Sequence, residues 1–381
     1  MNWLAIKMLM GDRLKYFGLI AGMAFAAMMI AQQASIFTGF KSQTVTFIRQ
    51  NPGVDLWVMD EQVRFSEDQV GMPETAVQRV RSVEGVEWAS PMFKGWLRAR
   101  LPDGTSMLVI VVGIDDATLV GGPHTVVEGA ITDLRQEGAI LIDVKDKASK
   151  LRMTRDGRDI EVGDRLSIND HELRIVGTYS SPPSFFWDPV LYTTYSRALQ
   201  ITPQERNLMS FVMVKLKPGA DVEDVRRRIE ERTPFVARTP AEFERLTSGF
   251  ILAKTGILVN FGIAVGLGLL IGIIVTGQTF FNFTVDNLRY FASLKAMGAG
   301  AGTLISMVMV QVLTATSIAF GLGLGIASVF GSLIRNTGLA FEMPWYIPAV
   351  TGGAMLTVGL LAGLFSLAKV LRLEAGVVFK A

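Results

Sequence analysis

Four long apolar stretches interrupt the alternation of hydrophobic and polar residues along this chain. They run over about residues 17–37, 256–281, 303–330 and 347–368, and none of them contains Asp, Glu, Lys or Arg. A hydrocarbon core about 30 Å thick needs roughly 20 mainly apolar residues per helix. The pattern therefore predicts four transmembrane helices, within residues 17–40, 250–283 (the second helix with a stalk), 303–332 and 347–368.

Residues 1–16, before the first stretch, predict a separate amphipathic helix. A cleaved signal peptide is the alternative for the first apolar stretch, because its run 17–31 is short enough for one. Gln32-Gln33-Ala34 is a poor cleavage site, so we expect a retained helix. The apolar face of the amphipathic helix comprises Trp3, Leu4, Met8 and Leu9, opposite Lys7, Arg13 and Lys15.

Between the first two transmembrane helices, residues 41–249 have the pattern of a mixed α/β domain. Strand–helix pairs at its two ends flank a β-rich insertion at about 120–205, which suggests two related lobes around an insert. Pro102-Asp103-Gly104 between two apolar runs predicts a hairpin, and Asp221 is placed to cap a helix. Strands are predicted at 54–59, 94–101, 107–113, 139–143, 160–162, 165–168, 172–176 and 211–216, and helices at 73–81 and 221–232.

Composition supports one aqueous block inside an apolar frame. Hydrophobic residues make up 50% of the chain, and residues 41–249 hold 58 of its 72 charged residues. The net charge of +2 leaves no basic stripe of the kind that nucleic-acid-binding proteins carry. The absence of cysteine excludes disulfides, thiol catalysis and cysteine metal sites. The fold class is therefore an α-helical membrane protein with four transmembrane helices and a large α/β extracytoplasmic domain.

Basic residues near the helix ends predict the orientation, because cytoplasmic loops carry an excess of Lys and Arg. The 333–346 loop carries only Arg335, offset by Glu342, and ends at Trp345 and Tyr346, which suit an outer aromatic belt. We therefore expect residues 1–16, 284–302 and 369–381 to be cytoplasmic, and the 41–249 domain and the short 333–346 loop to be periplasmic. The cytoplasmic basic residues are Lys7, Arg13, Lys15, Arg289, Lys295, Lys369, Arg372 and Lys380.

The transmembrane stretches offer only neutral polar groups, which argues against a self-powered ion-coupled pump. Such groups either hydrogen-bond between helices or line a substrate path. If the protein performs work, its energy then comes from a partner. The polar residues are Gln32, Gln33, Thr276, Gln278, Thr279, Asn282, Gln311, Thr314 and Thr316.

Glycines recur at a spacing of four residues in the transmembrane stretches. This spacing lets helices approach closely, in a bundle or in a dimer. The alternative is that glycine is simply common in such helices. The pairs are Gly262 with Gly266, Gly268 with Gly272, Gly321 with Gly325, and Gly359 with Gly363.

No catalytic or metal-binding pattern stands out in the 41–249 domain. His124 and His171 lack a flanking ligand pattern, and no serine lies in a Gly-x-Ser-x-Gly elbow. We expect solvated carboxylates at Asp115, Asp116, Asp143 and Asp146, and a solvated helix face at Arg226-Arg227-Arg228. The least ordinary segment is Phe185-Phe186-Trp187, flanked by prolines, which either fills the domain's own core or forms an exposed contact for a partner, cargo or lipid.

The loop between the second and third transmembrane helices carries a resemblance. Asn287-Leu288-Arg289-Tyr290-Phe291-Ala292-Ser293-Leu294-Lys295-Ala296-Met297-Gly298-Ala299 is similar to the coupling segment of the MacB/FtsX/LolC-type (type VII, mechanotransmission) ABC transporter permeases. Val83-Glu84-Gly85-Val86, Ser90-Pro91 and Val214–Ala220 resemble that family's porter-like periplasmic lobes. With this topology, the chain looks most similar to the DevC-like exporter permeases. Tyr290 departs from the family, which often has Glu there.

The resemblance implies a non-catalytic permease that forms a homodimer in the bacterial inner membrane. A separate cytoplasmic ATPase would bind ATP and Mg, since this chain has no phosphate-loop motif. A periplasmic adaptor (membrane-fusion protein) and an outer-membrane channel are the other expected partners, and export of an amphiphile is the expected function. FtsX-like signalling to a periplasmic hydrolase and lipid or lipoprotein extraction are the alternatives. The expected ATPase-coupling residues are Leu288, Arg289, Tyr290, Phe291, Leu294, Lys295, Met297 and Gly298, of which Leu288, Phe291, Leu294 and Met297 would form an apolar knob.

Overall fold

The computed structural model describes residues 2–147, 149–153, 157–203, 208–334 and 339–371. Among the basic residues that predict the orientation, Arg335, Arg372 and Lys380 lie outside this described part, as does the side chain of Lys369. The chain divides into two compact units, one of residues up to Phe40 and from Thr255 onward, and one of Lys41–Lys254. We call them the membrane unit and the outer unit.

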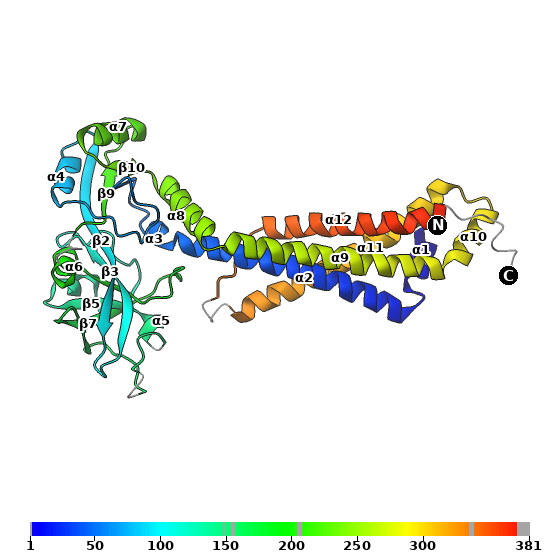
Figure 1. Ribbon diagram of the computed structural model, residues 1–381, viewed down its shortest axis with the longest axis horizontal. Helices are drawn as coiled ribbons and strands as arrows, with labels where there is room; N and C mark the ends of the chain where they lie inside the picture. The colour runs from blue at the N-terminus through cyan, green and yellow to red at the C-terminus, as the bar shows by residue number, and fades with distance from the viewer. Residues whose placement is uncertain (1, 148, 154–156, 204–207, 335–338, 372–381) are drawn as a thin grey trace. The chain divides into compact units, whose positions relative to one another are not determined.

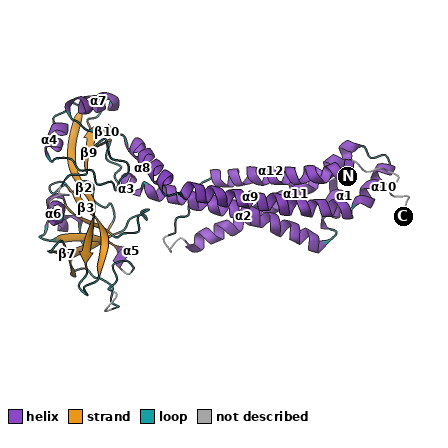
Figure 2. Ribbon diagram, viewed as in Figure 1, coloured by secondary structure: helices purple, strands orange, loops and turns teal. Residues whose placement is uncertain are grey.

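Four helices in the described part of the chain are long and apolar enough to cross a membrane, as predicted (Figure 2). All four extend beyond the predicted apolar stretches at one or both ends. A short helix precedes the first of them and another links the second and third. In chain order these helices are α1 (Asn2–Met10), α2 (Arg13–Thr44), α9 (Ile257–Asp286), α10 (Leu288–Ala296), α11 (Ala301–Ile334) and α12 (Tyr346–Leu371).

Small residues bring the long helices together. A Cβ at Gly323 of α11 would collide with the backbone and side chain of α2 at Ala24 and Ala27. A Cβ at Gly272 of α9 would lie 3.0 Å from Cβ of Ala26. In a bundle without a hydrophobic driving force between helices, such close approach is a main source of stability. The helix α2 therefore packs tightly against both α9 and α11.

The outer unit is built on one mixed sheet (Figure 1). Its strands follow the order β10-β1-β9-β2-β3-β8-β5-β7-β4, with β6 paired to β2 and β7. The strands of the two predicted strand–helix pairs, 54–59 and 211–216, are the neighbours β1 and β9 in this order. Each therefore lies between strands of the other pair's part of the chain, as in a split β-α-β arrangement. The strands are β1 (Leu56–Met59), β2 (Val86–Arg100), β3 (Ser106–Ile114), β4 (Val126–Glu128), β5 (Ala139–Asp143), β6 (Arg165–Ile168), β7 (His171–Tyr179), β8 (Val190–Thr194), β9 (Phe211–Leu216) and β10 (Val236–Arg238). The helices are α3 (Thr46–Arg49), α4 (Thr75–Arg81), η1 (Ile131–Arg135), α5 (Val144–Lys147), α6 (Tyr195–Ile201), α7 (Val222–Arg232) and α8 (Pro240–Lys254).

The long strand β2 joins the two parts of the sheet. Its first half, from Val86 to Met92, pairs with β9, and the second half, from Phe93 to Arg100, pairs with β3. The hairpin predicted around Pro102-Asp103-Gly104 is confirmed as the β2–β3 turn. The strand predicted at 160–162 is wrong: Ile160 is buried, but the chain turns at Gly163, whose φ is 101°.

Alternation along the strands supplies a core on each face of the sheet, because successive side chains point to opposite faces. Val58 of β1 belongs to the same buried cluster as Val80 of α4 and Ile229 of α7. Its neighbour Trp57 belongs to the opposite cluster, with an edge-on contact to Phe211 at 5.7 Å between ring centroids. The helices α3 and α8 contribute Phe47 and Phe243 to this second, aromatic core.

The helix α7 has the cap that its sequence predicts. The Asp221 side chain accepts a hydrogen bond from the backbone N–H of Asp224 at 3.0 Å. We expect Asp221→Ala to destabilise this part of the outer unit by about 1 kcal/mol, because a backbone donor loses its partner. Faster hydrogen exchange in α7 of the full-length protein would report the loss. Asp221→Asn, which keeps an acceptor, should exchange at the original rate, and equal exchange in Asp221→Ala would contradict the cap.

Candidate functional site

The linking helix α10 has one buried face and one exposed face. Phe291, Ala292 and Leu294 are 1%, 1% and 9% exposed. Phe291 and Leu294 belong to the same buried cluster as Leu9 of α1 and Leu304 of α11. The helix is thus packed into the membrane unit along one side.

The opposite face of α10 is open. Tyr290 is 64% exposed and Met297 is 75% exposed, and Arg289 and Ser293 are also exposed. Leu288 and Lys295 are half-buried. Gly298 follows the helix with a φ of 95°, a left-handed conformation that favours glycine and ends the segment.

These positions correct the predicted apolar knob. Of its four residues, Phe291 and Leu294 are buried among the chain's own helices and cannot enter a groove of another protein. Met297 remains fully available, and Leu288 in part. The surface that α10 offers is therefore smaller and more polar than the sequence pattern indicates.

A hollow of about 400 Å³ lies beside the exposed face of α10, in the membrane unit. Lys15 at the start of α2 and Asp286 at the end of α9 form an ion pair across it, with 2.5 Å between Nζ and Oδ2. Sequence reasoning missed this pairing, although Asp12 and Asp286 are two of only four acidic residues outside 41–249. The hollow is lined by Leu4, Lys7, Met8, Gly11, Asp12, Lys15, Phe283, Asp286, Asn287 and Tyr290.

The proline-flanked aromatic segment divides between the two predicted alternatives. Phe186 packs edge-on against Trp96 of β2 at 5.3 Å between ring centroids, and against Phe65 at 6.1 Å. The next residue, Trp187, is 63% exposed. Asp188 then accepts a hydrogen bond from the indole N–H of Trp96 at 3.1 Å. One ring anchors the loop in the outer unit while its neighbour faces outward.

Lys94 of strand β2 forms, with Glu67, the most deeply buried ion pair in the described part of the outer unit. Lys94 and Glu67 are each 4% exposed, and their Nζ and Oε1 atoms lie 2.5 Å apart. Burial lowers the pKa of Lys94, and the Glu67 carboxylate opposes this shift. The Lys94 ammonium also lies 3.5 Å from the ring centroid of Phe47 in α3. The pair therefore joins α3, the segment around residue 67 and the central strand.

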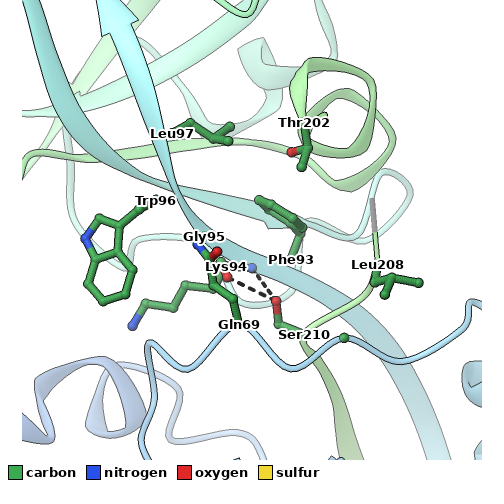
Figure 3. Close-up of a pocket in the computed structure, with 10 residues that line it drawn as sticks. Gln69, Phe93, Lys94, Gly95, Trp96, Leu97, Thr202, Leu208 and Ser210 are labelled. Carbon is green, nitrogen blue, oxygen red and sulfur yellow. Dashed lines mark hydrogen bonds between the residues drawn. The ribbon is translucent and has the colours of Figure 1, made fainter. Parts of the chain in front are cut away.

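A small pocket opens next to Lys94, with a volume of about 70 Å³ (Figure 3). Phe93, Leu97 and Leu208 supply apolar walls, while Ser210 exchanges hydrogen bonds with the Lys94 backbone. The remaining lining residues are Gln69, Gly71, Lys94, Gly95, Trp96 and Thr202. The space is suited to a few waters or one small side chain rather than to a whole amphiphile.

The glycine pairs sort into two groups. Cβ atoms added at Gly272 and Gly359 would meet neighbouring helices, at Ala26 and Val358 and at Val312 and Thr316 respectively. Gly268 and Gly363 also have neighbours from other helices within 4 Å. By contrast, Gly262, Gly266, Gly321 and Gly325 face open space. The first group packs the bundle of one chain, and the second leaves small residues on its outer surface.

Of the nine neutral polar residues predicted in the transmembrane helices, Gln311, Thr279 and Thr314 donate side-chain hydrogen bonds, whereas the buried hydroxyls of Thr276 and Thr316 have no partner among the described residues. The Gln311 side chain donates to the backbone carbonyl of Ala5 at 2.9 Å and so ties α11 to α1. Thr279 and Thr314 donate to carbonyls of their own helices. The hydroxyl of Thr284 in α9 bonds that of Ser366 in α12.

The polar clusters of the outer unit have structural partners. Nε2 of His124 lies 2.5 Å from the carbonyl of Gln50, and within the described residues no group of three metal-ligating side chains occurs. Asp115, Asp116 and Asp143 accept hydrogen bonds from Thr118, Ser196 and Ser181. Asp143 and Asp146 are 6% and 5% exposed, so the solvated carboxylates predicted at these two positions are wrong. Burial raises the pKa of Asp146, against an ion pair with Lys150 that lowers it. The Arg226-Arg227-Arg228 run forms ion pairs with acidic residues of α7, α8 and the loop before β2.

Comparison with known proteins identifies both units. A model of the MacB-like periplasmic core domain matches residues 16–232, and a model of the FtsX-like permease C-terminal region matches residues 262–375. No curated protein matches the chain.

Two solved structures are similar to the chain over about half its length. The extracellular domain of the noncanonic ABC-type transporter YknZ from Gram-positive bacteria is 14% identical, with a TM-score of 0.35, covering 49% of this chain and 98% of that one. The periplasmic region of MacB from Actinobacillus actinomycetemcomitans is 12% identical, with a TM-score of 0.37, covering 52% and 94%. The periplasmic core match alone spans more than half of the sequence, and the permease match covers most of α9 through α12. This chain therefore belongs to the MacB/FtsX-type family of ABC transporter permeases.

Proposed function

We propose that this chain is the membrane subunit of an exporter driven by a separate cytoplasmic ATPase. ATP and Mg bind to that partner, whose closure moves α10. The motion passes through the helices to the outer unit, which expels an amphiphilic substrate with the help of a periplasmic adaptor and an outer-membrane channel. Both termini and α10 lie in the cytoplasm in this proposal, and the outer unit lies in the periplasm.

The two-sided construction of α10 is the observation that carries the proposal. Its buried residues Phe291 and Leu294 belong to the cluster that also includes residues of α1, α2, α9, α11 and α12, so that a force on the helix acts on the whole bundle. Its exposed residues Tyr290 and Met297 supply an aromatic and an apolar contact on a helix short enough to enter a groove. A helix that only lay on the membrane surface would not need this second anchored face.

A second copy of the chain would complete the assembly. The exposed glycines Gly262 and Gly266 of α9 flank Ile263, which is 58% exposed. Small residues at this spacing permit close helix crossing between two chains. A homodimer would place two α10 helices opposite two ATPase subunits.

Met297 provides the direct test of coupling. We expect Met297→Asp to weaken ATPase binding about tenfold or more, because a charge replaces an apolar contact at the interface. The matched control Met297→Leu should keep binding and stimulated ATP hydrolysis. The measurement is ATPase co-purification and ATP turnover in nanodiscs. Full coupling in Met297→Asp would refute the assignment of this face.

The companions recovered in the same purification separate the functional alternatives. A membrane-fusion adaptor would support export, since it links the outer unit to an outer-membrane channel. A cell-wall hydrolase recovered instead would support FtsX-like signalling, and a lipoprotein or its carrier would support extraction. Each result leaves the ATPase coupling of α10 to be judged by the Met297 variants alone.

A further inference from the structure

The aromatic loop from Pro182 to Pro189 is fastened to the end of the first transmembrane helix. The backbone N–H of Phe185 donates to the carbonyl of Gln43 at 3.1 Å. The hydroxyl of Thr46 donates to the carbonyl of Pro183 at 3.0 Å. Gln43 lies in the last turn of α2, and Thr46 begins α3. The loop therefore occupies the part of the outer unit where the chain enters it.

Chain length limits how far this loop lies from the hydrocarbon core. Gln43 follows the last apolar residue of the helix, Phe40, by three positions. At the helical rise this is about 4.5 Å, whereas the headgroup layer on each side of a bilayer is roughly 5–7 Å deep. With Phe40 at the edge of the hydrocarbon core, where the predicted transmembrane helix 17–40 ends, the backbone of Phe185 would lie at headgroup depth.

The end of the outer unit, where the chain continues into α9, also lies close to the loop. Phe250, in the last two turns of α8, precedes the start of α9 by seven positions. Its ring stacks on Phe65 at 5.1 Å with an interplanar angle of 3°, and Phe65 in turn contacts Phe186. Residues adjoining both transmembrane helices thus surround the base of the loop.

The exposed chemistry of the loop suits a lipid surface. Trp187, 63% exposed, carries a large apolar ring with one polar N–H, the combination that is enriched at membrane interfaces. The ammonium of Lys145 lies 3.4 Å from the carbonyl of Ser181 at the start of the loop, and both Lys145 and Lys41 are exposed. These cations can meet lipid phosphates beside the indole.

We propose that Trp187 inserts into the headgroup layer of the bilayer and that the 182–189 loop is a lipid-contacting element of the outer unit. This inference rests on the proposed placement of the outer unit at the membrane surface. In an exporter of amphiphiles, it puts an aromatic side chain where a substrate leaving the outer leaflet would pass.

The test exploits the absence of cysteine from the chain. Trp187→Cys in the full-length protein is labelled with a nitroxide and reconstituted in phospholipid nanodiscs. The control is Val222→Cys, at an apolar residue that is 36% exposed at the start of α7. A Cβ at Gly85 would contact Val225 of α7, so α7 lies at the Val86 end of β2. Trp96, beside the loop, is ten residues further along this strand, about 33 Å away.

We expect the label at position 187 to lose accessibility to a water-soluble nickel relaxant by roughly twofold or more relative to position 222, and to gain accessibility to oxygen, which concentrates in lipid. A second measurement needs no label: brominated lipids should quench the emission of the unmodified protein more than that of Trp187→Phe. Equal nickel accessibility at both positions, or equal quenching, would overturn the proposal. So would protection of position 187 that appears only when a companion protein is added. Neither measurement involves the ATPase, so the outcome is independent of the Met297 test.

Discussion

Replacing Leu294 by Asp is expected to prevent the membrane unit from folding rather than to uncouple a folded protein from its ATPase. The Leu294 side chain is 9% exposed and lies in the cluster that joins α10 to α1 and α11. Truncating a buried leucine costs about 2–5 kcal/mol, and a buried carboxylate without a partner adds several more. The sum is comparable to the whole stability of a typical domain.

The experiment compares three variants by the yield of monodisperse protein in mild detergent and by its thermal unfolding. Leu294→Asp should give little folded protein. Leu294→Met, which conserves volume, should cost less than about 1.5 kcal/mol. Met297→Asp, at the exposed end of the same helix, should fold normally. If Leu294→Asp folds as well as Met297→Asp and only loses the ATPase, then Leu294 belongs to the partner interface and its burial in this chain is contradicted.

The contrast between Leu294 and Met297 shows what the sequence could not supply for α10. Its apolar residues recur at helical spacing, which predicts an apolar face but not what covers it. The buried cluster that contains Phe291 and Leu294 draws residues from α1, α2, α9, α11 and α12, and within it α1 and α11 are tied by a hydrogen bond between Ala5 and Gln311, 306 positions apart in sequence. The four long helices were predictable because each depends only on a local run without charge. The environment of α10 depends on the packing of all of them.

In the outer unit, too, local features were predicted from the sequence and long-range contacts were not. The hairpin at Pro102-Asp103-Gly104 and the cap at Asp221 are local signals, and both were predicted. The interleaving of β1 and β9 was not, because it depends on direct pairing between residues from opposite ends of the outer unit, such as Leu56 and Val214. The buried partnership of Lys94 with Glu67 was also missed, since either residue alone is typical of a surface.

These buried contacts bear on how force would cross the protein in the proposed function. A leverage mechanism needs stiff connections at each end of the path. Phe291 and Leu294 supply one between α10 and the bundle. Lys94 supplies another, since its ammonium meets Phe47 of α3 and its backbone belongs to β2, the strand that joins both parts of the sheet.

Removing the charge of the Lys94 side chain should therefore weaken the outer unit far more than breaking a more exposed ion pair would. We expect Lys94→Met to destabilise it by about 3–5 kcal/mol, because the Glu67 carboxylate stays buried without a cation and accepts a hydrogen bond from the Ser66 hydroxyl at 2.6 Å, its one remaining side-chain partner among the described residues. The readout is hydrogen exchange of β2 and β9 in the full-length protein. The double variant Lys94→Met with Glu67→Gln should recover much of the loss, because no buried charge then remains.

A half-buried ion pair in the same sheet provides the matched control. Lys215 and Asp55 lie 3.0 Å apart, but their side chains are 37% and 31% exposed. Water can replace either partner there, so Lys215→Met should cost no more than about 1 kcal/mol. Similar exchange rates in Lys94→Met and Lys215→Met would show that burial adds nothing to the Lys94–Glu67 pair. A large loss confined to Lys94→Met, reversed in the double variant, would establish the pair as a stiff joint between α3 and the central strand, which leverage on the outer unit requires.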